Sequence, residues 1–140
     1  MKKFNDYIYY MMHDDHNDEP YLFYIKGNRF SLQIDAGNSP KSYKQFEELL
    51  EEEGLKKPDL LVLTHWHWDH TFGLISAKCP VIASNKTQEY LKDVLTWSWN
   101  EEDMLQRIKE KKDIEFCYEK MHVEYPDISK ISTRLADMLK

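Results

Sequence analysis

Short apolar segments separated by turn-forming residues occupy the first part of the chain. Residues 7–12 (YIYYMM), 21–25 (YLFYI) and 30–34 (FSLQI) are rich in aromatic and β-branched side chains, which favour strands. Gly27 and Asn28 lie between the second and third segments and predict a tight hairpin turn with positive φ angles. The pattern therefore predicts three consecutive strands.

The spacing of apolar residues changes after residue 38. Apolar side chains between residues 43 and 50 recur at intervals of three and four, which predicts an amphipathic helix. We expect Ser39 to cap this helix, Pro40 to occupy its first turn and Gly54 to end it.

Two continuous apolar runs follow this helix. Residues 59–63 (DLLVL) and 81–84 (VIAS) are typical of short strands buried on both faces. The order of strand, helix and strand indicates an α/β fold, in which functional residues gather at the carboxyl ends of the strands.

The remainder of the chain is predicted to be helical. One helix is expected to begin after Ser84 and another after Asn100, with acidic residues in its first turn and Lys109, Lys111 and Lys112 in its last. Residues 127–140 form a final amphipathic segment, which either packs on the core or docks another chain. Its apolar side contains Ile128, Ile131, Leu135 and Met138.

Length and composition predict a single domain over residues 1–140, with a strand-rich core at 1–85 and a helical segment at 86–140. The 41% hydrophobic and 31% charged residues are typical of a soluble globular protein, and the apolar runs are too short to cross a membrane. A net charge of −6 argues against nucleic acid as the principal partner. Cys79 and Cys117 are far apart and indicate free thiols, so we predict a cytoplasmic location.

Three of the six histidines lie within residues 65–70 (HWHWDH), directly after a predicted strand. In an extended chain His65, His67 and Asp69 project to one side, and His70 joins them if a helix begins there. Imidazole and carboxylate groups are the ligands expected for zinc, with iron or manganese as alternatives. The alternative is a polar surface loop, but this spacing arises by chance with a probability on the order of one in a thousand.

The segment THWHWDHTFGL resembles the HxHxDH signature of the metallo-β-lactamase superfamily, and FSLQIDAG is similar to the strand of that family that ends in aspartate and glycine. The order of predicted elements also matches over residues 5–85. The resemblance implies an α/β fold that is half of an αββα sandwich, with an added helical segment at the C-terminus.

The resemblance also implies roles for individual residues. His65 and His67 would bind a first metal, Asp69 and His70 a second, and Asp35 would support the site. Two zinc ions would hold a hydroxide that attacks an ester, thioester, amide or phosphoester bond of a small-molecule substrate, with Asp69 orienting the nucleophile or moving its proton. For Asp35 the alternative is a turn residue before Gly37.

The later motifs of the family are not visible in this sequence. Beyond His70 the only histidine is His122, which lacks the flanking glycines of those motifs. Three interpretations remain: a truncated hydrolase, a half domain completed by a second copy or another chain, and a non-catalytic remnant. The substrate is not predicted, because one fold supports many chemistries.

Two further observations leave alternatives open. His13 and His16 lie in an acidic loop and are interpreted as solvated turn residues, although His16 or Tyr21 could contact a substrate. Trp97 and Trp99 either line the rim of a pocket or pack between helices.

Overall fold

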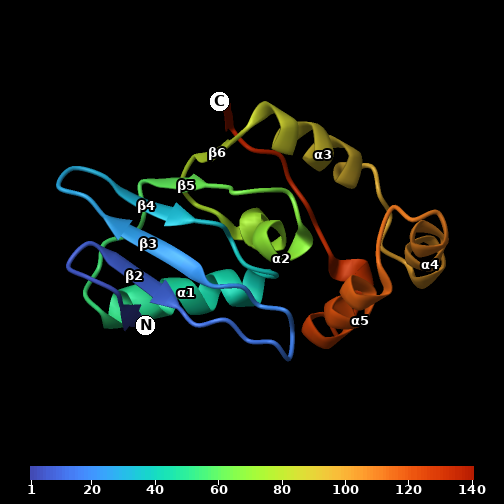
Figure 1. Ribbon diagram of the computed structural model, residues 1–140, viewed down its shortest axis with the longest axis horizontal. Helices are drawn as coiled ribbons and strands as arrows, with labels where there is room; N and C mark the ends of the chain where they lie inside the picture. Colours follow the sequence, from blue (N-terminus) through green and yellow to red (C-terminus); the bar gives the residue numbers. More distant parts are fainter.

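The computed structural model describes residues 1–140 as one seven-stranded sheet with five α-helices around it (Figure 1). The strands are β1 (Lys2–Lys3), β2 (Ile8–Met11), β3 (Leu22–Lys26), β4 (Ser31–Ile34), β5 (Leu60–Val62), β6 (Val81–Ala83) and β7 (Met138–Leu139). The helices are α1 (Pro40–Glu52), α2 (Trp68–Thr71), α3 (Asn85–Leu95), α4 (Glu101–Lys109) and α5 (Glu115–Glu124), with 3-10 helices η1 (Phe72–Ser76) and η2 (Ile128–Lys130).

The strands follow one another in sequence order across the sheet. β1 to β4 pair antiparallel, and β4 to β7 pair parallel. The five strands predicted between residues 7 and 84 are confirmed. The sequence therefore predicted the α/β class correctly. The expectation that β5 and β6 are buried on both faces is wrong, because alternate side chains of these strands are only half-buried.

The predicted turn geometry between β3 and β4 is wrong. Neither Gly27 nor Asn28 has a positive φ angle. Gly27 is needed for another reason, because a Cβ atom at this position would lie 2.1 Å from the carbonyl oxygen of Phe30. The hairpin therefore depends on close backbone approach instead of a left-handed conformation.

One face of the sheet is covered by helices. Ser39 caps α1 by accepting a hydrogen bond from the backbone N–H of Ser42 at 3.0 Å, and Gly54 follows the helix with a φ of +68°. Phe46 and Leu50 of α1 pack on the buried side of β2 and β3. Leu91 of α3 belongs to a second buried cluster, which contains residues of β5 and β6. These contacts hold α1 and α3 on the sheet.

The opposite face of the sheet is apolar and only half-buried. Side chains on β2 to β6 alternate between buried and half-buried positions, and the strand registers align the half-buried ones in two rows across the sheet. None of them belongs to a buried cluster. We call this surface the open face: Ile8, Tyr10, Phe23, Ile25, Leu32, Ile34, Leu60, Val62 and Ile82.

The helices α3 and α4 are present as predicted, with Ser84 and Asn100 as their caps. α4 ends at Lys109, so Lys111 and Lys112 lie beyond its last turn. The sequence did not predict α5, because its apolar residues are spread around the helix and form no stripe. Figure 1 shows α4 and α5 at the end of the molecule toward which β4 points.

The helix expected at residues 127–140 is not formed. The segment contains η2 and then an extended stretch that ends in β7. The backbone N–H groups of Asp137 and Lys140 donate to carbonyl oxygens of Val81 and Ala83, each within 3.0 Å. This pairing satisfies the edge of β6, and the local apolar spacing did not reveal it.

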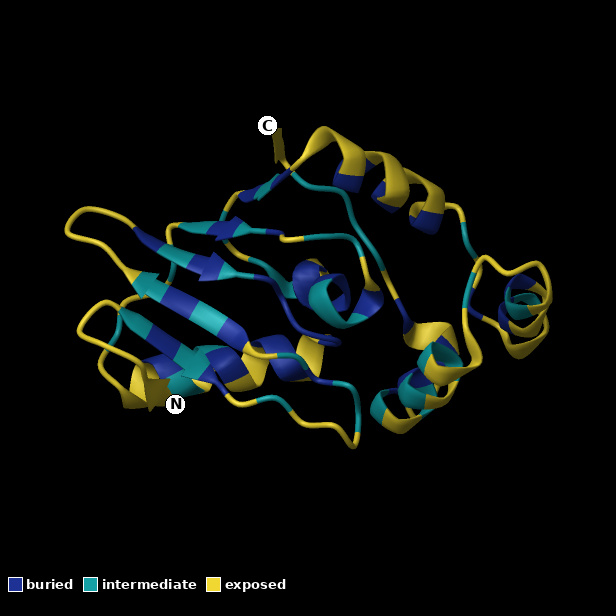
Figure 2. Cartoon of the chain, viewed as in Figure 1, coloured by how far each residue is buried: buried dark blue, intermediate teal, exposed yellow.

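A third buried cluster joins the C-terminal helices to the histidine-motif region: Trp68 of α2 and Phe72 of η1 belong to the same cluster as Met104 of α4 and Met121 of α5. Figure 2 shows that α3 turns its buried residues inward and its exposed residues outward. None of the helices is both long and apolar enough to cross a membrane.

Candidate metal site and adjoining pocket

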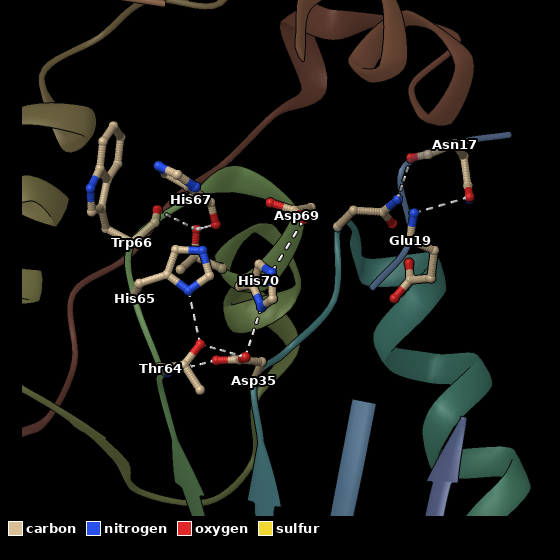
Figure 3. A network of polar contacts seen from close by, with 11 residues as sticks. Asn17, Glu19, Asp35, Thr64, His65, Trp66, His67, Asp69 and His70 are labelled. Carbon is tan, nitrogen blue, oxygen red and sulfur yellow. Dashed lines mark hydrogen bonds and ion pairs between the residues drawn. The ribbon is translucent and has the colours of Figure 1, made fainter. Parts of the chain in front are cut away.

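The histidine motif lies directly after β5, in the turn that leads to α2. The ring centroids of His65 and His67 are 4.7 Å apart, and those of His65 and His70 are 4.2 Å apart. His70 joins the other two rings because α2 begins at Trp68 and turns the chain back. Figure 3 shows Asp69 beside His70, with 3.3 Å between Oδ2 of Asp69 and Nε2 of His70.

Asp35 connects the end of β4 to the histidine motif. It follows β4 directly, is 4% exposed, and adopts a φ of +63°. Its Oδ1 accepts a hydrogen bond from the backbone N–H of Thr64 at 2.8 Å, and its Oδ2 accepts one from the Thr64 hydroxyl at 2.7 Å. Oδ2 also contacts Nδ1 of His70 at 2.7 Å (Figure 3). Asp35 therefore holds the segments on both sides of the motif.

These contacts determine which nitrogen of two histidines carries a proton. A carboxylate only accepts hydrogen bonds, so Nδ1 of His70 donates to Asp35. The single hydroxyl proton of Thr64 goes to Asp35, so Nδ1 of His65, at 2.9 Å from the Thr64 oxygen, must donate to that oxygen. In the neutral rings of His65 and His70 the lone pair is therefore on Nε2, which is the form that binds a metal.

The rings of His65 and His70 differ in their charge at neutral pH. Burial lowers the pKa of His65, and the neighbouring rings of His70 and His67 lower it further, so His65 is neutral at neutral pH. Burial also favours the neutral form of His70, but hydrogen bonds to Asp35 and Asp69 outweigh it and raise the pKa to about 9. A metal that binds His70 must therefore displace a proton at neutral pH.

Two glycines allow the backbone around Asp35 to approach the motif closely. A Cβ atom on Gly73 would lie 2.0 Å from the carbonyl oxygen of Ala36. The N–H of Gly73 donates to the carbonyl of Gly37 at 3.1 Å, and Gly37 itself has a φ of +83°. The segment after the motif is thus fixed against the turn that carries Asp35.

The donor set fits a metal ion in its chemistry, since it offers two imidazoles with defined Nε2 lone pairs, a third imidazole and a carboxylate. As the side chains stand, however, no three His, Cys, Asp or Glu side chains converge to hold an ion. Nε2 of His70 is turned toward Asp69. Binding therefore requires these side chains to turn toward a common point.

Thr64 and Glu19 are residues near the site that the sequence analysis did not single out. Thr64 precedes the first histidine and could have been suspected only from that position. Glu19 is 6% exposed, and neither of its carboxyl oxygens has a hydrogen-bond partner within normal geometry. Burial raises its pKa to about 7.

The other histidines lie away from the motif's hydrogen bonds. His122 in α5 contacts Glu101 through Nε2 and the carbonyl of Tyr118 through Nδ1. His13 contacts Asp15 at 2.8 Å and packs on Tyr21. His16 lies in the same acidic loop, where its backbone N–H donates to Asp14.

A pocket of about 410 Å³ opens beside the motif. His67 and Asp69 form part of its lining, and the opposite side comes from α3, α5 and the loops next to α4. Trp97 and Trp99 both line this pocket, which is one of the two environments considered from the sequence. Trp99 also belongs to the third buried cluster, which is the other, packing between helices.

Comparison with known proteins gives one family match, over part of the chain. Residues 21–78 match the model of the metallo-beta-lactamase superfamily. A comparison with curated proteins gave no match.

Solved structures with the same fold include three metallo-beta-lactamases. A HARLDQ-motif mutant of the enzyme from Cronobacter sakazakii is 20% identical with a TM-score of 0.53, over 65% of this chain and 37% of that one. The subclass B3 enzyme BJP-1 of Bradyrhizobium japonicum is 23% identical with a TM-score of 0.53, over 64% and 34%. The enzyme from Pontibacter korlensis is 16% identical with a TM-score of 0.52, over 66% and 46%.

The family-model match confirms the resemblance seen in the sequence over residues 21–78, and the solved structures share the fold. The matched region contains Asp35 and the whole histidine motif. The chain spans less than half the length of each of the three structures, and its mixed α/β architecture corresponds to part of their fold.

Proposed function

We propose that this chain carries the metal-binding half of a metal-dependent hydrolase. The observation that carries the proposal is the hydrogen-bond network in which Asp35 orients His70 directly and His65 through Thr64. The network engages Nδ1 of both rings, so Nε2 is the nitrogen that would bind a metal in His65 and, once its proton is displaced, in His70. We propose zinc as the metal, because imidazole and carboxylate groups suit it, with iron or manganese as alternatives.

His65 and His67 would hold one ion, and Asp69 and His70 a second. A metal bound there supplies hydroxide at neutral pH and polarises the bond to be cleaved. Asp69 would accept a hydrogen bond from the nucleophile and orient it toward an ester, thioester, amide or phosphoester group. His67 and Asp69 line the pocket, so a bound small molecule reaches these groups from that side.

Asp35 and Thr64 act as positioning residues in this proposal. They restrict the positions of the His65 and His70 rings before a metal binds, so less conformational freedom is lost when the side chains turn toward a common point. We propose a cytoplasmic location, because both cysteines are free thiols.

The experiment is a hydrolysis assay with zinc, iron or manganese added to chain purified without chelator. Four substrates are tested: one ester, one thioester, one amide and one phosphoester. His67→Ala serves as the inactive variant. His13→Ala is the matched control, because His13 lies in an exposed loop with no contact to the motif. We expect metal-dependent turnover that His67→Ala abolishes and His13→Ala retains. Turnover that is equal in all three proteins would refute the assignment.

A second candidate function, a half domain that acts by assembly, is favoured by the open face. Nine half-buried apolar side chains form two continuous rows on this face, and a contiguous apolar surface is typical of a protein–protein interface. We propose that a second α/β half, either another copy or a separate chain, packs on this face. Such a partner would also supply the metal ligands that this chain lacks.

Light scattering tests self-assembly through this face. Val62 lies within this face, since it pairs with Ile34 on one side and Ile82 on the other. A dimer that Val62→Glu converts to a monomer would support assembly, and Lys44→Glu on the exposed side of α1 is the control. A wild-type monomer throughout the micromolar range would contradict assembly with a second copy.

A further inference from the structure

The side of the pocket that faces the histidine motif is built by the C-terminal helices. All four tryptophans of the chain line this pocket. Trp66 and Trp68 come from the motif itself, and Trp97 and Trp99 come from the connection between α3 and α4. A further aromatic side chain, Phe116, comes from α5. The pocket is therefore lined mainly by aromatic and aliphatic groups.

The rings of this lining are held in place. The guanidinium of Arg107 lies 4.7 Å from the ring centroid of Trp97 and 4.7 Å from that of Trp99, and its Nη1 donates to the carbonyl of Ser98 at 2.8 Å. Trp66 stacks on Tyr90 of α3 with 4.8 Å between the ring centroids. An apolar ligand would thus enter a surface whose side chains are already ordered.

The charged groups of the lining, apart from the motif, balance one another. Lys111 and Lys112 are exposed, and Lys112 contacts Glu110 at 3.5 Å. Asp18 and Asp113 supply two carboxyl groups. Two basic and two acidic groups favour neither an anion nor a cation, so apolar contact determines what binds.

We propose that this pocket binds a neutral aromatic or bulky apolar group of the substrate and places the adjoining bond beside His67 and Asp69. The proposal rests on the proposed hydrolase function and adds the substrate class. The segment that determines specificity is residues 94–121, which lies outside the region that matches the family model.

Two exposed apolar residues at the pocket allow a test without damage to the fold. Ile114 is 59% exposed and Phe116 is 50% exposed, yet both line the pocket. The matched control is Phe30, which is 68% exposed in the hairpin between β3 and β4 and does not line it. The variants are Ile114→Ser, Phe116→Ser and Phe30→Ser.

The probe is naphthalenemethanol, and the readout is tryptophan fluorescence of the metal-free protein, because every tryptophan lines the pocket. We expect saturable quenching, a Kd that rises about fivefold or more in Phe116→Ser and Ile114→Ser, and no change in Phe30→Ser. Naphthoate, the anionic analogue, should bind more weakly than the neutral probe.

Three results would overturn the proposal. They are an absence of saturable binding to wild-type protein, tighter binding of naphthoate, and binding that the two pocket variants leave unchanged. A wild-type dimer that Phe116→Ser dissociates, without probe binding, would show that the lining is an oligomer interface. Since no metal is needed, probe binding by a chain that fails to hydrolyse any substrate would reject the proposed function and retain the pocket.

Discussion

Replacement of Asp35 by asparagine tests the hydrogen-bond network at the metal site. Asparagine has the same shape and tolerates the positive φ of +63° at this position. Its Oδ1 can still accept from the N–H of Thr64, but the Nδ2 group in place of Oδ2 only donates. Nδ1 of His70 must then accept, which moves the ring proton to Nε2.

The same substitution changes His65 through Thr64. The Thr64 hydroxyl can no longer donate to residue 35, so it donates to Nδ1 of His65 and moves that proton to Nε2 as well. Both rings lose the lone pair that binds a metal. Loss of an outer-shell partner typically costs 10- to 100-fold in metal affinity, so we expect about 100-fold for Asp35→Asn, which affects two rings. Thr64→Val affects His65 alone and should cost about tenfold.

The assay is zinc competition against a chromophoric chelator, with circular dichroism and thermal melting to establish that each variant is folded. Thr64→Ser keeps the hydroxyl and is the matched control for Thr64→Val. A folded Asp35→Asn variant whose zinc affinity stays within about twofold of wild type would refute the argument from the proton positions. Equal losses in Thr64→Ser and Thr64→Val would refute the role given to the hydroxyl.

Two further predictions concern stability. The pKa of Glu19 in the folded chain, about 7, lies above its ordinary value of 4.5, so its contribution to stability is present below pH 4.5 and is lost as the pH rises through 7. Glu19→Gln should therefore stabilise the protein by roughly 2 to 3 kcal/mol more at pH 8 than at pH 4. The measurement is urea denaturation at both pH values, and an equal effect at both would contradict the prediction. Gly73→Ala should cost more than about 3 kcal/mol, because its Cβ would lie 2.0 Å from the Ala36 carbonyl oxygen. Gly54→Ala, with open space around it but a positive φ, should cost only about 1 kcal/mol, and the reverse order would show that the close approach relaxes easily.

Local chemistry made much of the fold predictable. The strands and the caps Ser39, Ser84 and Asn100 could be predicted because their signals are short-range: alternating or continuous apolar residues, and a side-chain oxygen that caps a helix. The segment at 127–140 was not predictable in the same way. Its conformation depends on pairing with β6, more than fifty residues earlier in the chain.

In the candidate site, too, short-range features were predictable and long-range contacts were not. The histidine spacing indicated that the three rings lie together, and they do. Asp69 was expected in an extended segment but lies in α2, because the helix begins at Trp68. The role of Thr64 was hidden, since it depends on Asp35, which is 29 residues away in sequence. The pocket was hidden as well, because it is formed by segments that meet only in the folded chain.

The most direct test of the metal site is the zinc content of the purified chain. Protein prepared without chelator is incubated with zinc, freed of excess ion and measured by elemental analysis, with the molar mass obtained by light scattering on the same sample. We expect about one zinc or more per wild-type chain and loss of that zinc in His67→Ala. Wild-type protein that is folded and binds no more zinc than His67→Ala would contradict it.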